Sequence, residues 1–285
     1  MQKMLNYYKN MAAKCLANAS DGAKNNRRTC CFFSGLVRQA RHTASSSCLL
    51  GRWVRKETMN YSNWRSRLQN SAYVTNAILV VTILVFLLET FSGGSTNNSV
   101  LVFYGARLNP LILYGQWWRL MTPVFVHIGL MHILVNGFSL YYLGQMTEQL
   151  FGHWRFFLLY FISGFAGNVA SFAFSPNTLA AGASTAIFGL LGACLMLGDS
   201  FKENPVIRQL ARQFLLLVGL NLLFNLFSSG IDIFGHIGGL LGGFLAAGML
   251  GAPALGRMGT PRRIASAVTL LFGLGALLFL GFNAG

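Results

Sequence analysis

Seven apolar segments dominate the chain, and several approach or exceed the ~20 residues that a helix needs to cross a bilayer. They cover residues 73–92, 124–148, 154–174, 184–199, 209–228, 234–251 and 264–281. A backbone inside lipid must satisfy its own hydrogen bonds, which favours helices for such segments. With 54% hydrophobic and 10% charged residues, the chain is also too apolar for an ordinary water-soluble domain. The sequence therefore predicts an all-α fold, a polytopic transmembrane helix bundle with seven spans.

Basic residues are distributed unevenly, and their placement predicts an orientation in the membrane. Thirteen of the 22 Lys and Arg residues precede residue 73, where only Asp21 and Glu57 oppose them. With a cytoplasmic N-terminus, Lys or Arg residues lie in or beside all three cytoplasmic loops, while the outer loops hold only Arg107 and Arg119. By the positive-inside rule we expect a multi-pass plasma-membrane protein with its N-terminus cytoplasmic and its C-terminus outside. The span count favours a bacterial inner membrane.

Residues 1–58 are polar and basic and lack a clear periodicity, so several interpretations stay open. The segment has the composition of a transit peptide, but also of a disordered cytoplasmic tail. A third interpretation makes Met59 the true start of the protein. We expect a basic extension at 1–58, a six-span core at 59–255, and a basic loop with the seventh span at 256–285. The net charge of +15 is then explained by a lipid surface, and no nucleic acid is expected.

The five cysteines do not predict a disulfide framework. Cys194 falls in an apolar segment, and the other four lie in the basic extension, at Cys15, Cys30, Cys31 and Cys48. A cytoplasmic segment is not an oxidising environment, and the adjacent pair lacks the spacing of a zinc site.

Three polar residues lie at comparable positions along the predicted second, fourth and sixth spans. Ser184 and His236 each lie 15 residues from the inner end of their spans, and His132 lies 16 residues from the inner end of its own. These spans run in one direction, so all three residues should lie ~22–24 Å above the inner edge of the bilayer core. Ionisable groups inside a membrane are costly and usually functional. We therefore expect the three side chains to share one depth.

Glycines should let the fourth and sixth spans approach closely. Gly189 and Gly192 lie on the fourth span, and His236, Gly239 and Gly243 share one face of the sixth. Small residues at four-residue spacing allow two helix backbones to touch, which would carry the histidine to the serine.

A serine and a histidine within hydrogen-bond reach can perform acyl transfer. Ser184 would attack a peptide carbonyl, and His236 would accept its proton as the general base. The developing oxyanion needs hydrogen-bond donors. Candidates are the backbone N–H of Ser184 at a helix N-terminus and the side chains of His132 and Asn136, which lie one turn apart on one face.

These residues are where the chain resembles the rhomboid intramembrane serine proteases, over about residues 70–255. The resemblance lies in Trp118-Arg119, His132-Ile133-Leu134-Val135-Asn136, Gly144 with Glu148, Gly182-Ala183-Ser184, and His236-x-x-Gly239-x-x-x-Gly243. Several motifs in the right order and spacing make it specific.

The resemblance implies a serine endopeptidase with a Ser184–His236 dyad and with His132, Asn136 and Ser184 as oxyanion donors. Phe188 matches an aromatic that packs on the catalytic histidine, and Gly182 and Gly239 match supporting positions. The implied substrates are single-span transmembrane proteins cut near the outer face of the bilayer, with no cofactor. A seventh span after a six-helix core also resembles one known subtype.

Two positions need separate comment. Thr185 stands where many members of the family have glycine, and a β-branched side chain there could alter the turn or crowd the oxyanion site. Asp232 lies four residues before His236, and we expect it to be the N-cap of the sixth span rather than a third catalytic group.

Other functions fit these residues less well. A metal site of His127, His132 and His236 would lack a carboxylate and an H-E-x-x-H motif. An aspartyl protease needs two facing acids in the membrane, and a transporter should show repeated halves with broken helices. A catalytically inactive rhomboid-like protein that binds membrane clients is the main alternative, although such a relative would normally have lost the serine or the histidine.

A membrane-embedded site also needs a movable cover. We expect it in the loop before Ser184, at Ser175-Pro176-Asn177, and in the fifth span with the loop at 228–233.

Overall fold

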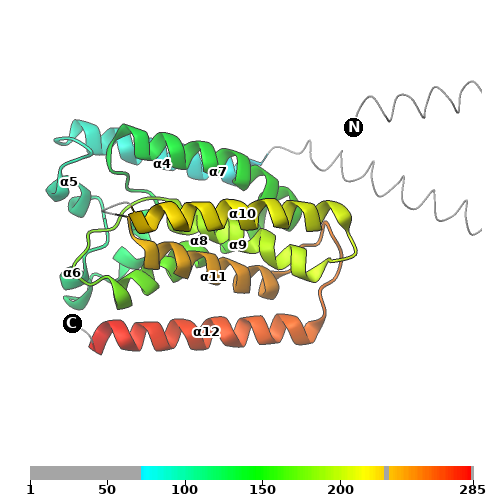
Figure 1. The fold of residues 1–285 in the computed structure, drawn as a ribbon. Coiled ribbons are helices and arrows are strands. Elements are labelled where there is room, and N and C mark those ends of the chain that lie inside the picture. The colour runs from blue at the N-terminus through cyan, green and yellow to red at the C-terminus, as the bar shows by residue number, and fades with distance from the viewer. Residues whose placement is uncertain (1–71, 228–230, 284–285) are drawn as a thin grey trace, which may run out of the picture. The chain divides into compact units, whose positions relative to one another are not determined.

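The computed structural model describes residues 72–227 and 231–283, and this part of the chain is built from helices (Figure 1). A helix lies at each of the seven predicted spans. In chain order these are α4 (Tyr73–Phe91), α7 (Gly129–Phe151), α8 (His153–Phe174), α9 (Ser184–Ser200), α10 (Pro205–Phe227), α11 (Ile233–Leu250) and α12 (Thr260–Asn283). The expected extension at residues 1–58, with its four cysteines, lies outside the described residues.

The number of membrane crossings is supported only in part. Five of the described helices are long and apolar enough to span a bilayer, namely α4, α8, α10, α11 and α12. Helix α9 is apolar but has only 17 residues, and α7 is not among the five. Seven helices thus lie where spans were predicted, while seven crossings remain a prediction.

The predicted start of the second span, at residue 124, was wrong. Between α4 and α7 the chain forms four short elements, α5 (Asn98–Phe103), α6 (Asn109–Leu113), η2 (Trp117–Leu120) and η3 (Thr122–Val124). Pro123 has no N–H to donate, and its segment forms a 3₁₀ turn rather than a helical entry. The apolar run therefore continues through a turn and a loop before α7 begins at Gly129.

Helices α8, α9 and α11 form the centre of the bundle, and their backbones touch at glycines. A Cβ added to Gly239 would overlap the backbone of Thr185, and one added to Gly243 would overlap the backbone of Gly189. On the other side of α11, a Cβ at Gly238 would meet Ala170 of α8. The predicted close approach of the fourth and sixth spans is confirmed, because only residues without a side chain fit at these contacts.

Peripheral helices attach to this centre through fewer contacts. Glu148 of α7 is buried and holds the start of α4, because its carboxylate accepts hydrogen bonds from the Val74 and Thr75 backbone N–H groups and from the Thr75 hydroxyl at 2.6–3.1 Å. Helix α12 is joined to the end of α9 by a pair between Arg262 and Asp199. Figure 1 shows α12 along one side of the bundle and α10 running roughly parallel to it, with α11 between them in this view.

The loop before Ser184 is fixed by a buried arginine. Arg107 is fully buried between α5 and α6, and its guanidinium donates to the carbonyls of Ser175 and Thr178 at 3.2 and 3.0 Å. The backbones of Arg107 and Ala180 also form an isolated β-bridge. The loop is thus held at three places along its length. A movable cover remains a prediction, both for this loop and for the fifth span with the loop at 228–233, of which residues 228–230 lie outside the described residues.

Candidate active site

The side chains of Ser184 and His236 meet at the start of two helices. Ser184 is the first residue of α9, and His236 lies in the first turn of α11. The Ser184 Oγ and His236 Nε2 atoms are 2.9 Å apart, which is hydrogen-bond distance. Asp232 caps α11, because its carboxylate accepts a hydrogen bond from the Gly235 N–H at 3.0 Å. The predicted N-cap is thus confirmed, and it fixes the turn that carries the histidine.

The imidazole of His236 is held on two further sides. Phe188, one turn below Ser184, stacks on the ring with centroids 4.3 Å apart and planes 10° apart. The side-chain amide of Asn225, on α10, lies 2.7 Å from Nδ1 of the ring. Sequence reasoning missed Asn225. The available signal was the occurrence of two amides, Asn221 and Asn225, one turn apart within an otherwise apolar helix.

The two residues predicted as oxyanion donors face Gly182, two residues before the serine. A Cβ built on Gly182 would lie 2.8 Å from Nε2 of His132 and 3.3 Å from Nδ2 of Asn136. Gly182 also has a φ of 125°, a left-handed conformation that favours glycine. Glycine is needed at this position both for its backbone conformation and for the space that it leaves beside the two side chains.

Both of these side chains present an N–H at the site. The Ile128 N–H donates to Nδ1 of His132 at 3.4 Å, so the neutral ring carries its hydrogen on Nε2. The Asn136 amide nitrogen is buried and has no hydrogen-bond partner within residues 72–227 and 231–283. A buried amide without a partner is costly, and an acceptor brought by a substrate would satisfy it.

His127 is a second residue that sequence reasoning undervalued. It is fully buried just before α7, and its Nε2 accepts the backbone N–H of Ala183 at 3.3 Å. Its ring centroid lies 5.2 Å from that of His132. His127 therefore orients the chain immediately before Ser184. The described residues contain no group of three or more His, Cys, Asp or Glu side chains placed to hold a metal ion.

Thr185 faces away from the predicted oxyanion site. A Cβ added to Gly167 of α8 or to Gly235 of α11 would lie 3.0 or 3.2 Å from the Thr185 methyl, so the side chain fills the space that these glycines leave. Its hydroxyl is buried without a partner in the part of the chain that the structure describes. The difference from glycine at this position is accommodated by packing against α8 and α11, not beside His132 and Asn136.

Comparison with known proteins assigns the chain to a family. The Rhomboid domain model matches residues 114–253. RHOMBOID-like protein 7 of Arabidopsis thaliana is 31% identical over 219 residues, which cover 68% of this chain and 69% of that protein. The chain is a multi-pass membrane protein that belongs to the rhomboid family.

Relatives named as proteases match over shorter parts of their own length. "Rhomboid protease GluP" of Bacillus subtilis is 42% identical over 210 residues, covering 74% of this chain and 41% of that protein. "Rhomboid-like protease 1" of Toxoplasma gondii is 43% identical over 157 residues, covering 53% of each chain. The chain thus spans about half the length of these two relatives.

Proposed function

We propose that this protein is an intramembrane serine endopeptidase that works with a Ser184–His236 dyad. The observation that carries the proposal is the 2.9 Å contact between the serine hydroxyl and the histidine Nε2, beside two N–H donors that face Gly182. The protease names of the relatives from Bacillus subtilis and Toxoplasma gondii support the same activity. An intact pair of this geometry favours the protease over a catalytically inactive protein that binds membrane clients.

Acylation begins when the Ser184 hydroxyl attacks the carbonyl carbon of a peptide bond. His236 takes the serine proton on Nε2 and later gives it to the leaving amine, and water then releases the acyl group by the same proton transfers in reverse order. Negative charge develops on the former carbonyl oxygen. His132 Nε2–H, Asn136 Nδ2–H and the Ser184 backbone N–H donate to that oxygen.

The substrates are single-span transmembrane proteins, cut near the outer face of the bilayer. A 17-residue helix is ~26 Å long, which is shorter than a ~30 Å hydrocarbon core. With its inner end at the membrane edge, α9 therefore holds Ser184 below the outer surface. The charge distribution supports a cytoplasmic N-terminus and a C-terminus outside, and the predicted span count favours a bacterial inner membrane.

Labelling with a serine-directed fluorophosphonate probe tests the activity without a known substrate. Purified full-length protein in detergent is compared with the Ser184→Ala and His236→Ala variants. We expect labelling of the wild type and at least ~10²-fold slower labelling of both variants, because each removes one half of the proton transfer. A folded wild-type protein that does not react would contradict the proposal and favour a non-catalytic protein that binds membrane clients.

A further inference from the structure

The geometry points to Asn225 as the residue that positions His236 and selects which of its ring nitrogens carries the proton, an inference that rests on the proposed function. The ring lies between two polar partners, Ser184 at Nε2 and Asn225 at Nδ1, at 2.9 and 2.7 Å. Phe188 stacks on its face and leaves rotation within the ring plane to be fixed by these two contacts. Asn225 comes from a different helix than either member of the pair, so it adds an independent constraint.

Only one of the two neutral forms of His236 can act as the base. To accept the serine proton, Nε2 must be unprotonated, so Nδ1 must carry the hydrogen and needs an acceptor. The amide oxygen of Asn225 is such an acceptor, whereas its nitrogen can only donate and would hold the hydrogen on Nε2. The structure places the amide nitrogen, Nδ2, at 2.7 Å from Nδ1, which is the donor orientation. Because the two ends of the amide have nearly the same shape, a half-turn about its last bond exchanges them and brings the oxygen to Nδ1.

The acceptor orientation also stabilises the charged intermediate. When His236 has taken the serine proton, both ring nitrogens carry hydrogen, and Nδ1–H must donate to something. The titratable groups whose charge reaches the ring are Asp232 on its own helix and His132 on α7. The carboxylate of Asp232 is engaged with the Gly235 N–H and the Ser171 hydroxyl. Asn225 is the group in hydrogen-bond contact with Nδ1.

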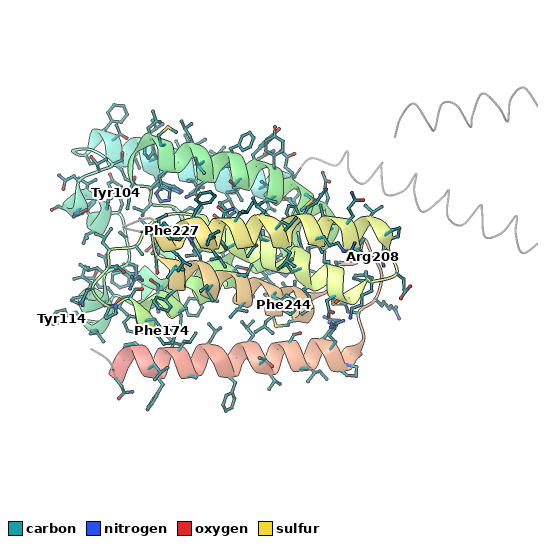
Figure 2. The ribbon with its side chains drawn as sticks, in the orientation of Figure 1. Tyr104, Tyr114, Phe174, Arg208, Phe227 and Phe244 are labelled. Atoms are coloured by element: carbon teal, nitrogen blue, oxygen red, sulfur yellow. The ribbon has the colours of Figure 1, made fainter. Side chains whose placement is uncertain are left out.

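The position of Asn225 makes the state of the base depend on where α10 lies. Asn225 is two residues from Phe227, which ends α10 on the side of the bundle where α5 and α6 lie, whereas Arg208 marks the opposite end (Figure 2). Near that opposite end, α10 packs tightly on α9, because a Cβ at Gly198 would overlap the Ala211 side chain. Tilting α10 about this contact would move Asn225 away from His236. His236 is therefore oriented as a base only while the end of α10 that carries Asn225 stays packed beside it.

The test compares three variants by the rate of fluorophosphonate labelling as a function of pH, with the full chain in detergent. Asn225→Ala removes the acceptor, and Asn225→Asp supplies an acceptor that cannot donate. Asn221→Ala is the matched control, because Asn221 lies one turn earlier on α10 and its amide donates to the Leu217 carbonyl of its own helix. Melting temperatures of all three report on folding.

We expect Asn225→Ala to label roughly 10- to 100-fold more slowly than the wild type, while Asn221→Ala labels at the wild-type rate. Asn225→Asp should recover labelling at alkaline pH. Its acidic limb should move up by roughly one pH unit or more, because a carboxylate beside Nδ1 favours the imidazolium and removes the free base at a higher pH. If Asn225 only packed against the ring, the acidic limb of the pH profile would not move.

Unchanged labelling of Asn225→Ala, or an Asn225→Asp profile that coincides with the wild type, would overturn the inference. Either result would leave the proposed function intact as long as wild type reacts and Ser184→Ala does not. Failure of the wild type to react would instead overturn both.

Discussion

Two of the helices that contact α9 and carry groups of the site, α11 and α10, differ in how firmly they are held. Helix α11 lies against α9 at Gly239 and Gly243, where no side chain separates the backbones. Helix α10 has 23 residues, of which only Ile207 and Val218 are buried, whereas 8 of the 18 residues of α11 are buried. Helix α11 is therefore part of the core of the bundle, whereas α10 packs on the outside of that core.

The proposed membrane-embedded protease has two requirements, and each is met by a different one of these helices. The Ser184–His236 distance must be held within a few tenths of an ångström, and the α9–α11 contact is rigid enough to do so. A substrate helix must also enter from the lipid, which needs an element that can move at low cost. The weakly buried α10 is the element expected to move, and by the inference above Asn225 would couple its position to the orientation of the His236 ring.

The largest effect should come from adding one methyl group to the rigid contact. We expect Gly243→Ala to lower the free energy of unfolding by more than the ~1–3 kcal/mol typical of overpacking, because its Cβ would overlap the backbone of Gly189 and not a flexible side chain. Labelling of the serine should fall with it. Thermal unfolding in detergent measures the loss.

Gly219→Ala on α10 is the matched control. A Cβ at Gly219 meets nothing within 4 Å, so alanine should be neutral or stabilise α10 by ~0.5–1 kcal/mol through its helix propensity. Equal effects of the two substitutions would contradict the contrast between α11 and α10.

The sequence predicted the rigid contact well and the weak one poorly, for a physical reason. Glycines at fixed spacing have one dominant use between membrane helices, so Gly239 and Gly243 indicated a contact whatever its partner. Apolar residues such as Leu216 and Phe227 occur all round α10. Lipid and protein interior favour the same side chains, so these residues do not distinguish a lipid-facing side from a packed one. The apolar residues therefore do not show which face of α10 meets α9. The pair Asn221 and Asn225 marks one face, but it does not identify His236 as the partner of Asn225.

The second effect concerns the space beside Gly182. We expect Gly182→Ala to slow serine labelling by ~10²-fold with a smaller loss of stability, because the new methyl group would lie 2.7–2.8 Å from the His132 ring and displace a proposed oxyanion donor. Labelling rates and melting temperature, measured together, separate the two consequences.

Gly115→Ala controls for backbone strain in that experiment. Gly115 also has a positive φ, of 93°, but nothing lies within 4 Å of a Cβ there. It should show the cost of the left-handed conformation without the loss of labelling. If both substitutions slow labelling alike, strain and not the donor would be the cause.

The site was predictable to the extent that chemistry identifies its members. A serine and two histidines predicted at one depth, with an asparagine one turn from one of the histidines, carry an unusual signal in apolar helices. Ser184 and His236, and likewise His132 and Asn136, do converge in pairs. His127 was considered only as a member of a metal site, which the missing carboxylate and H-E-x-x-H motif argue against, yet the turn after Pro123 brings it to Ala183. Loop geometry of this kind has no periodicity from which to read it.

The third effect in size should come from Thr185→Gly, at the contact of α9 with α8 and α11. Because the threonine fills space left by Gly167 and Gly235, glycine would leave a cavity and loosen the first turn of α9. We expect a loss of ~1–3 kcal/mol in unfolding free energy and no gain in labelling rate. Faster labelling of this variant would mean that the side chain crowds the site after all.

The smallest effect should come from the ion pairs at the other end of α9. Asp199 pairs with Arg262 of α12 and with Lys202 at 3.0 Å, but its side chain is 39% exposed, so solvent screens both pairs. We expect Asp199→Asn to lower the unfolding free energy by less than ~1 kcal/mol, and the loss should shrink at high salt. Glu203→Gln, an exposed acid four residues along the chain, controls for removing a charge there. A large, salt-insensitive loss for Asp199→Asn alone would mean that charge pairing, and not only backbone contact at glycines, fixes the helices around α9.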